Sequence, residues 1–366
     1  MSATYRVAVV GATGQVGRLM LHLLRERGFP ASEIVPFASE RSVGTQIDGF
    51  GAVQGLTAES IEGFDVALFS AGGSVSGEWA PRFAEAGAIV IDNSSRWRMS
   101  DEVPLVVSEV NPDALDVLAR PAADARQGAI VANPNCSTMQ MVVALKPLQA
   151  AAGIERLVIS TYQAVSGTGK QAVQELADQS RAVLDAAGNG TAATIAPGVY
   201  RHQIAFNALP EAGSFAPGDD HTDEERKLIN ETRKILGDPS IRVSATCVRV
   251  PVFIGHSEAV NVQTRDELTP ERARELLEAA PGVTVLDDPQ SARYPLATLA
   301  EGQDAVLVGR IRRDPGHERA LDMWVVADNL RKGAATNAVQ IAELLDERDL
   351  IGNPAPASGG EPLPTR

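Results

Sequence analysis

Short apolar runs alternate with amphipathic segments and small polar turns in the first third of the chain. Residues 7–10 form a β-branched run typical of a buried strand, and apolar side chains then recur at helical spacing over residues 16–24. Further buried strands are expected at residues 34–37, 66–69 and 88–91. Strands that alternate with helices in this way predict an α/β domain with a doubly wound, parallel sheet.

The α/β pattern continues through the rest of the chain. A helix is expected directly after Cys136, a strand over residues 156–165, and a C-terminal helix from residue 334 to about residue 348. Thr222, followed by three acidic residues, has the pattern of a helix N-cap. The Pro- and Gly-rich tail, residues 353–366, is expected to be loosely ordered.

Composition and charge exclude several classes of partner. The 366 residues are enough for two domains, and the net charge of −14 disfavours nucleic acid and anionic membranes as partners. The sequence has no apolar run near the ~20 residues of a membrane span and no signal-peptide pattern. Two cysteines are too few for a disulfide framework, so we expect a cytoplasmic location. No cluster of side chains has metal-ligand spacing.

A glycine-rich turn lies between the first strand and the first helix. Gly11, Gly14 and Gly17 are spaced as GxxGxxG, which differs from the GxGxxG of many dinucleotide-binding folds. A turn in this context brings backbone N–H groups and a helix N-terminus to a pyrophosphate. A tight turn without a ligand remains the alternative. The candidate cofactor-binding residues in this turn are Gly11, Thr13, Gly14, Gln15 and Val16.

The turn after the second strand is where such a fold selects its cofactor. Glu40 would bind a free ribose 2′-OH, whereas Arg41 would bind a 2′-phosphate. The hydroxyls of Ser39 and Ser42 on either side of Arg41 favour NADP, although a solvated turn is also possible. Ser70 and Gly72 follow the third strand at the same edge of the sheet and are further candidates.

Cys136 is the candidate nucleophile. It follows Asn135 at an expected helix start, where unpaired N–H groups and the helix dipole favour a thiolate. The alternative is a small buried hydrophobe, which is our interpretation of Cys247 in its apolar run. His256 lies in an apolar segment and becomes a candidate acid/base when it is paired with Cys136 and an upstream Arg249.

Three other features are ambiguous from the residues alone. The turn with Ser166 and Gly167 could hold a cofactor or simply join two elements. Glu224 and Lys227 share a helix face and could bind a zwitterionic substrate or bridge each other. Arg98 follows a polar turn on the expected ligand side of the sheet, but it could also be a surface charge.

These segments together resemble the aspartate-β-semialdehyde dehydrogenase family over almost the whole chain. The segments that carry the resemblance are residues 11–17, 135–136, 163–167, 206–210, 249–251, 256–257 and 329–333. The resemblance implies the reversible, NADP-dependent reductive dephosphorylation of L-4-aspartyl phosphate to aspartate semialdehyde, on the branch to lysine, methionine and threonine. It also favours NADP over NAD at the Ser39–Arg41–Ser42 turn.

Roles for individual residues follow from the same resemblance. Cys136 is implied as the nucleophile that forms a thioester, His256 as the acid/base, and Gln163 as the residue that positions the acyl group. Backbone N–H groups at the helix start are expected to stabilise the oxyanion. The implied substrate ligands are Arg249 for the α-carboxylate, Glu224 for the α-amino group, and Arg98, Lys227 and Asn135 for the phosphate. The implied cofactor contacts extend to Ser166, Gly167 and Asn329.

The resemblance also implies the domain organisation: a Rossmann-type nucleotide-binding domain and an α/β catalytic and dimerisation domain. The NADP-binding domain is expected over residues 1–134, completed by a C-terminal segment over residues 329–352, and the catalytic domain over residues 135–328, in a homodimer. Two alternatives remain at this point. One is N-acetyl-γ-glutamyl-phosphate reductase, which shares the thioester chemistry, and the other is a non-catalytic NADP-binding homologue.

Overall fold

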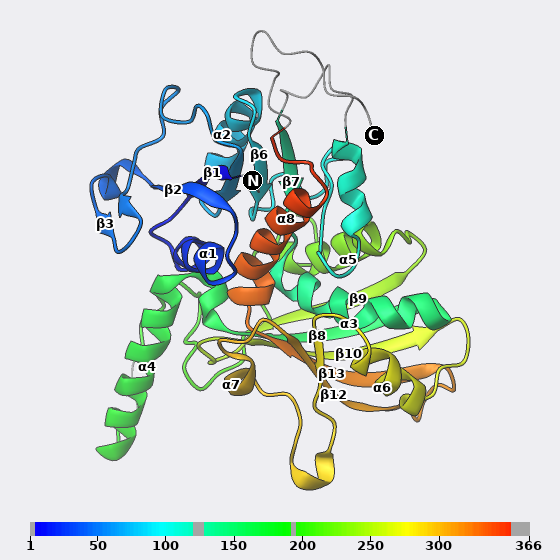
Figure 1. The fold of residues 1–366 in the computed structure, drawn as a ribbon. Coiled ribbons are helices and arrows are strands. Elements are labelled where there is room, and N and C mark those ends of the chain that lie inside the picture. Colours follow the sequence, from blue (N-terminus) through cyan, green and yellow to red (C-terminus); the bar gives the residue numbers. More distant parts are fainter. Residues whose placement is uncertain (1–3, 120–127, 192–194, 353–366) are drawn as a thin grey trace. The chain divides into compact units, whose positions relative to one another are not determined.

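The computed structural model describes residues 4–119, 128–191 and 195–352, so the tail at 353–366 lies outside the described residues. The chain divides into two compact units, which are coloured along the sequence in Figure 1. The first unit takes Met1–Ser108, Pro112–Asn133 and Ala338–Arg366, and the second takes Glu109–Asn111 and Pro134–Asn337.

A five-stranded parallel sheet forms the centre of the first unit. In spatial order its strands are β2 (Ala31–Phe37), β1 (Tyr5–Val10), β5 (Val66–Phe69), β6 (Ile89–Asp92) and β7 (Ala129–Ala132). The strands expected near residues 7, 34, 66 and 88 are therefore confirmed, although β2 begins three residues earlier than expected. Strand β7 was not predicted.

Helices pack on this sheet as the alternating pattern predicts. Helix α1 (Gln15–Glu26) packs against β1 and β2, and α2 (Gly73–Glu85) packs against β5, β6 and β7. The unit also contains the short helices η1 (Glu40–Ser42) and η2 (Pro112–Leu118), the small hairpin of β3 (Gln46–Ile47) and β4 (Gly51–Ala52), and α8 (Thr336–Glu347) from Ala338 onward.

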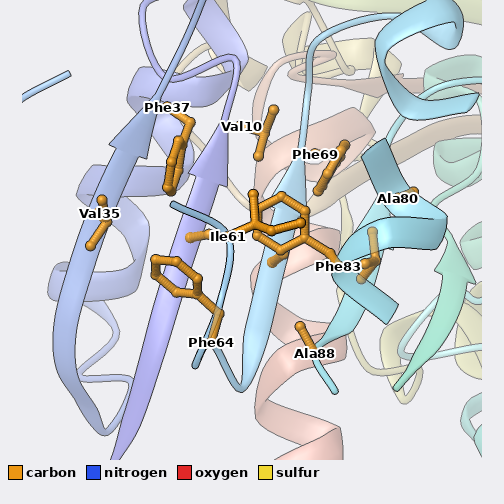
Figure 2. Close-up of a cluster of buried hydrophobic side chains, with 12 residues drawn as sticks. Val10, Val35, Phe37, Ile61, Phe64, Phe69, Ala80, Phe83 and Ala88 are labelled. Carbon is orange, nitrogen blue, oxygen red and sulfur yellow. The ribbon is translucent and has the colours of Figure 1, made fainter. Parts of the chain in front are cut away.

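The core on the α2 face of the sheet is built around Phe83, which Figure 2 shows among the side chains of the neighbouring strands. Its ring meets Phe69 and Phe37 edge to face, with centroids 5.3 and 6.2 Å apart. The alternate positions Val9 and Leu68 face the opposite side and are also fully buried. Burial of both faces explains why the strands are continuously apolar.

A six-stranded mixed sheet forms the second unit. In spatial order its strands are β11 (Val283–Val285), β12 (Val306–Arg313), β13 (Ala320–Ala327), β10 (His256–Thr264), β8 (Ile154–Gln163) and β9 (Arg242–Arg249). β8 and β9 run parallel, whereas β10 is antiparallel to both β8 and β13. The expected strand at 156–165 is β8, which begins and ends two residues earlier.

The long helix α3 (Cys136–Ala152) packs on this sheet and on a second helix, α5 (Asp223–Leu236). The other helical segments are η4 (Val165–Thr168), α4 (Lys170–Gly188), α6 (Pro270–Glu278), η5 (Pro289–Ser291), α7 (Ala297–Ala300) and η6 (Arg331–Ala335), the last a π-helical turn. The N-cap expected at Thr222 is confirmed as a capping box with Glu225. Among the described residues, no helix has the length and apolar character needed to cross a membrane.

Candidate active site

Cys136 is the first residue of helix α3, as the sequence predicts. The preceding Asn135 is the N-cap, and its side-chain oxygen accepts the N–H groups of Ser137 and Thr138 at 3.0 and 3.3 Å. The thiol is partly exposed, whereas Cys247 is buried. The cysteine therefore lies at the positive end of a helix dipole, which favours its thiolate form.

This cap changes one expectation about the oxyanion. Because Ser137 and Thr138 already donate their N–H groups to Asn135, these two groups are not available to a tetrahedral intermediate without loss of the cap. In this arrangement the two N–H groups order the first turn of α3, at the positive end of the helix dipole.

A glycine in the π-helical turn η6 allows close approach to the cysteine. A Cβ atom at Gly333 would lie 2.9 Å from the Cβ of Cys136, so any other residue at 333 would displace the nucleophile or the turn. π-helical turns are often found at functional sites. Gly333 lies in the 329–333 segment that carries the family resemblance, and no role was predicted for it.

Three predicted site residues lie side by side at the end of the mixed sheet; we name Arg249, Gln163 and His256 the catalytic row. Gln163 of β8 is the register partner of Arg249 of β9. Tyr162 pairs with Ser257 across β8 and β10, so His256 lies on the other side of Gln163. All three side chains are buried on the same face of the sheet.

The ring of His256 is oriented by its surroundings. Its Nδ1 accepts the backbone N–H of Ala164 at 3.0 Å, so the proton of the neutral ring is on Nε2. Nε2 is buried and has no hydrogen-bond partner among the described residues. Burial, and secondarily the charge of Arg249, holds the pKa of His256 well below its ordinary value. The imidazole is therefore neutral at pH 7, with Nε2–H as a hydrogen-bond donor and the Nδ1 lone pair directed to Ala164.

Arg249 and Gly167 complete the surroundings of this ring. The Nη1 of Arg249 donates to the backbone oxygen of Ala164 at 2.8 Å. Gly167, in η4, lies so close that a Cβ atom there would be 3.2 Å from both Nη1 of Arg249 and Nε2 of His256. The space beside Nε2 is thus kept open by a glycine.

Replacing Gly167 by alanine should therefore reduce activity without unfolding the protein. The methyl group would occupy the space next to Nε2 of His256, and we expect kcat/KM to fall by roughly tenfold, about 1.4 kcal/mol in the transition-state free energy. Steady-state kinetics and thermal denaturation on the same sample measure the two effects. Gly188→Ala is the matched control, because a Cβ atom there meets nothing within 4 Å. Equal kinetics in both variants would show that this space is not used.

A buried ion pair lies next to the capping residue. The Nδ2 of Asn135 donates to Glu224 at 2.9 Å, and Lys227 donates to Glu224 at 3.2 Å and to Asp223 at 2.6 Å. Burial alone would raise the pKa of Glu224, but Lys227, Asn135 and Arg249 outweigh it and lower the pKa. The two acidic partners likewise raise the pKa of Lys227 against its burial. Glu224 and Lys227 therefore bridge each other, and both are charged.

Two of the expected cofactor contacts are joined to the His256 segment. The Nδ2 of Asn329 donates to Ser166 Oγ at 2.9 Å, and its Oδ1 accepts the N–H of Gly255 at 2.9 Å. Asn329 thus fixes the turn that begins at Ser166 against the residue before His256. This arrangement is internal to the second unit.

The other expected cofactor residues meet at the carboxyl edge of the parallel sheet in the first unit. The N–H groups of Gly11 and Ala12 donate to Phe37 at the end of β2, and Ser70 donates to Val10 at the end of β1. Gly11 has a φ of 88°, and a side chain at Gly11 or Gly17 would clash with neighbouring backbone. The glycine turn, the Ser39–Ser42 turn and the Ser70–Gly72 turn therefore follow adjacent strands.

The residues of this edge fit a dinucleotide. The turn presents backbone rather than side chains, and α1 directs its N-terminus toward the same edge. The Oε1 atom of Gln15, the first residue of α1, is buried and has no partner among the described residues. Glu40 and Arg41 are exposed in η1, so each is accessible to a ribose or its phosphate.

Arg98 is a buried residue and not a surface charge. Its Nε donates to the backbone oxygen of Asn133 at 3.0 Å and its Nη2 to that of Asn93 at 2.9 Å. The two carbonyls hold the guanidinium in one orientation. All three residues belong to the first unit.

Two supporting residues were missed by sequence reasoning. Glu231 of α5 accepts the backbone N–H of Asn135 at 2.7 Å, and Gln140 of α3 donates to the backbone oxygen of His256 at 3.3 Å. Both side chains are buried. Neither belongs to a motif, and the only sequence signal is a polar residue on the apolar face of a helix.

Comparison with known proteins agrees with this arrangement. The family models that match are described as "Semialdehyde dehydrogenase, NAD binding domain" over residues 6–118 and "Semialdehyde dehydrogenase, dimerisation domain" over residues 145–332. These matches and the site define an NAD(P)-dependent semialdehyde dehydrogenase.

The curated relatives narrow this class. Aspartate-semialdehyde dehydrogenase of Aquifex aeolicus is 55% identical over 95% of this chain and 99% of its own length. The Bacillus subtilis protein of the same name is 47% identical over 96% of this chain and 100% of its own length. The chain belongs to the aspartate-semialdehyde dehydrogenase family, an oxidoreductase family that uses NAD(P).

Solved structures show the same likeness. Aspartate semialdehyde dehydrogenase II of Vibrio cholerae, complexed with ASA, has a TM-score of 0.86 at 47% identity and covers 95% of this chain and 99% of its own. The Candida albicans enzyme, solved with NADP, has a TM-score of 0.75 at 27% identity and covers 95% of this chain and 100% of its own.

Proposed function

We propose that this chain reduces L-4-aspartyl phosphate with NADPH to L-aspartate 4-semialdehyde and phosphate, reversibly, in the biosynthesis of lysine, methionine and threonine. The observation that carries the proposal is the position of Cys136 at the capped start of α3, in the same unit as the buried catalytic row. A nucleophilic thiol, a neutral imidazole, an amide and a guanidinium are the groups that acyl transfer from an amino-acid substrate requires.

The reaction begins at Cys136. Cys136 reacts as the thiolate that the helix dipole favours, its proton having passed to solvent, and attacks the acyl carbon; the new C–S bond forms as the C–O bond to phosphate breaks, and phosphate leaves with the electron pair. Gln163 holds the acyl group in place. Reduction of the thioester carbon needs a hydride, which NADPH would supply when bound. The C–S bond then breaks, Cys136 returns to its thiolate form, and the aldehyde is released; His256 acts as the acid, because its Nε2–H can donate to the acyl oxygen while that oxygen carries negative charge.

Substrate recognition uses the charged groups around the nucleophile. Arg249 binds the α-carboxylate, because its planar guanidinium matches a carboxylate, and the charged Glu224 binds the α-ammonium group. Arg98, Lys227 and Asn135 bind the phosphate. A free ammonium group fits Glu224 and an acetylated one does not, so the charged state of Glu224 disfavours N-acetyl-γ-glutamyl-phosphate as substrate.

Phosphate-dependent NADP reduction tests this function directly. With L-aspartate 4-semialdehyde and phosphate we expect turnover, followed by NADPH absorbance, and no turnover when phosphate is omitted. N-acetylglutamate 5-semialdehyde under the same conditions should give no comparable rate. Equal rates with the two aldehydes would contradict the substrate assignment, and no rate with either would favour a non-catalytic NADP-binding protein.

We also propose NADP as the preferred cofactor, bound by Gly11, Thr13, Gly14, Gln15, Val16, Ser39, Arg41, Ser42, Ser70 and Gly72, with Ser166, Gly167 and Asn329 toward the nicotinamide. Arg41 is exposed in the short helix η1, with the hydroxyl residues Ser39 and Ser42 in the same turn. An exposed guanidinium beside hydroxyl groups supports a site for the 2′-phosphate.

Replacing Arg41 by alanine should raise the KM for NADP by roughly 10- to 100-fold, the loss expected for hydrogen bonds to a charged phosphate. The KM for NAD should not change, because NAD has no 2′-phosphate. Glu40→Gln in the same turn is the control and should not raise the KM for NADP. If Arg41→Ala raised the KM for NAD as much as the KM for NADP, Arg41 would not be the residue that binds the 2′-phosphate.

The proposed domain organisation is an NADP-binding domain over residues 1–134 with residues 329–352, and a catalytic domain over residues 135–328. The division of the compact units at 133/134 supports the first boundary, whereas residues 329–337 lie in the second compact unit and the return to the first unit begins at Ala338. The chain acts as a homodimer in this proposal. The match to the dimerisation-domain model supports a homodimer. The sheet face opposite α3 is a second support, because the aromatic rings of Tyr162 and Trp324 lie there with centroids 5.3 Å apart. Two free thiols suit a cytoplasmic location.

A further inference from the structure

A second row of side chains lies directly behind the catalytic row; we name Cys247, Thr161 and Glu258 the second row. Thr161 of β8 is the register partner of Cys247 on β9 and of Glu258 on β10. Each member is two residues from a member of the catalytic row, so both rows share one face of the sheet. The Nε2 of Gln163 donates to Thr161 Oγ1 at 3.2 Å and joins the rows.

Glu258 is the unusual member of the second row. Its side chain is completely buried, and neither carboxyl oxygen has a hydrogen-bond partner of good geometry among the described residues. An unpaired carboxylate in such a place is strongly disfavoured. Burial, followed by the repulsion of Glu224, raises the pKa of Glu258 well above its ordinary value, and the neighbouring Gln140 amide only partly offsets this.

The charged and titratable groups around Glu258 do not neutralise it. Helix α5 contributes two acidic residues and strand β9 contributes one arginine. The charged residue of α3 is Lys146, which is exposed. The groups to consider are Glu224 and Glu225 of α5, Arg249 and Cys247 of β9, His256 of β10 and Cys136 of α3. Arg249 lies in the catalytic row and its Nη1 is directed to Ala164, and the ionic group that acts on Glu258 is another acid, Glu224.

Gln140 connects Glu258 to both reactive residues. It lies one turn after Cys136 on the same face of α3, four residues along. Its Nε2 donates to the backbone oxygen of His256 at 3.3 Å, whereas its Oε1 is buried and lacks a partner among the described residues. An O–H donor at the adjacent Glu258 is the complement that this oxygen needs.

We propose that Glu258 is a positioning residue: a neutral carboxylic acid that donates its O–H to Oε1 of Gln140 and so ties the helix of Cys136 to the strand of His256. This inference rests on the proposed function for its kinetic consequences. The carboxyl acts through Gln140 and does not touch the substrate.

Neutrality matters because of the distance to His256. A carboxylate two residues along the same strand face would favour the imidazolium form, whose Nδ1–H cannot accept the N–H of Ala164. A neutral acid provides the donor for Gln140 without placing a negative charge beside the imidazole. A protonated Glu258 can therefore form a hydrogen bond with Gln140 and leave the charge state of His256 unchanged.

The test compares two substitutions. Glu258→Gln keeps the shape and supplies an N–H donor without a titrating group; we expect kcat within about threefold of wild type and an unchanged acidic limb of the kcat/KM profile. Glu258→Leu removes the donor and should lower kcat by roughly tenfold, the equivalent of one hydrogen bond, with little change in KM. Infrared difference spectra of wild type against Glu258→Gln should show a protonated carboxyl band at neutral pH.

A matched control is Glu225→Gln. The two oxygens of Glu225 accept the N–H groups of Thr222 and Cys247, so an amide there sets a donor against a donor and should lower the Tm, unlike Glu258→Gln. A loss above tenfold in Glu258→Gln, a displaced acidic limb, or no protonated carboxyl band would each overturn the proposal. If wild type fails to turn over the aldehyde, the proposed function fails, while the infrared band still decides the state of Glu258. If Glu258→Leu does not fold, the other two measurements decide.

Discussion

Replacing Cys136 by serine is expected to reduce turnover by at least about 10⁴-fold, the size of effect seen when an enzyme loses its covalent nucleophile. A hydroxyl at this position is not ionised by a helix dipole, and an ester intermediate accepts hydride less readily than a thioester. The fold should be unchanged, because the cap on α3 comes from Asn135 and not from the thiol. Initial rates of NADP reduction with aspartate semialdehyde and phosphate measure the loss.

The second cysteine provides the control. Cys247 is fully buried, and burial raises the pKa of its thiol well above the ordinary value, so Cys247→Ala should keep activity within about an order of magnitude. Iodoacetamide near neutral pH should modify Cys136 and leave Cys247 unmodified, and substrate should protect Cys136. NADPH binding should be equal in the Cys136→Ser variant and wild type. Full activity of Cys136→Ser would refute the proposed thioester chemistry.

Local patterns in the sequence predicted four strands of the parallel sheet and, in the second unit, strand β8 and the starts of helices α3 and α5, whereas strands β9–β13 were not predicted. The glycine turn after a β-branched run, the helix start at Cys136 and the N-cap at Thr222 each depend on neighbours within about five residues, and all three are confirmed. Strand β7 escaped prediction because its apolar run, Ala129–Ala132, has only four residues, two of them alanine, although Gly128 and Asn133 with Pro134 flank it. Short apolar runs do not distinguish strand from helix by periodicity.

The candidate site was predictable where residue type and spacing carry the chemistry. Cys136, Gln163, Arg249 and His256 were named from the sequence and the family resemblance, and the structure brings the last three together in one row. Their site roles stay predictions until tested.

The supporting residues were not predictable from spacing. Gln140, Glu231 and Glu258 reach the site only through the packing of α3, α5 and β10, whose contacts join positions roughly 90 to 120 apart in the chain. Nothing local distinguishes a buried Glu258 from an exposed glutamate on a half-buried strand. The π-helical turn that brings Gly333 against Cys136 has the same origin, because its hydrogen bonds depend on the surrounding structure.

Replacing His256 by asparagine is expected to lower kcat/KM by about 10²- to 10⁴-fold, the usual contribution of a general acid/base. Asparagine was chosen because its Oδ1 can take the place of Nδ1 and accept the N–H of Ala164, so the variant loses Nε2 and little else. Steady-state kinetics across pH measure the effect. A variant with normal activity would show that another group transfers the proton.

The pH dependence gives His256 an independent signature. The pKa of this histidine is held well below its ordinary value, so the acidic limb of the wild-type kcat/KM profile should lie below pH 6.5 and be absent in His256→Asn. The pH dependence of stability also reports the lowered pKa of His256. The unfolded chain binds a proton at this ring below about pH 6.5 and the folded chain does not, so the free energy of unfolding of wild type decreases as pH falls below that value. The loss is about 1.4 kcal/mol per pH unit for one proton, and His256→Asn should lack it. Chemical denaturation at a series of pH values, with the two proteins side by side, measures the difference in slope; equal slopes would mean that the ring is already protonated in the folded protein.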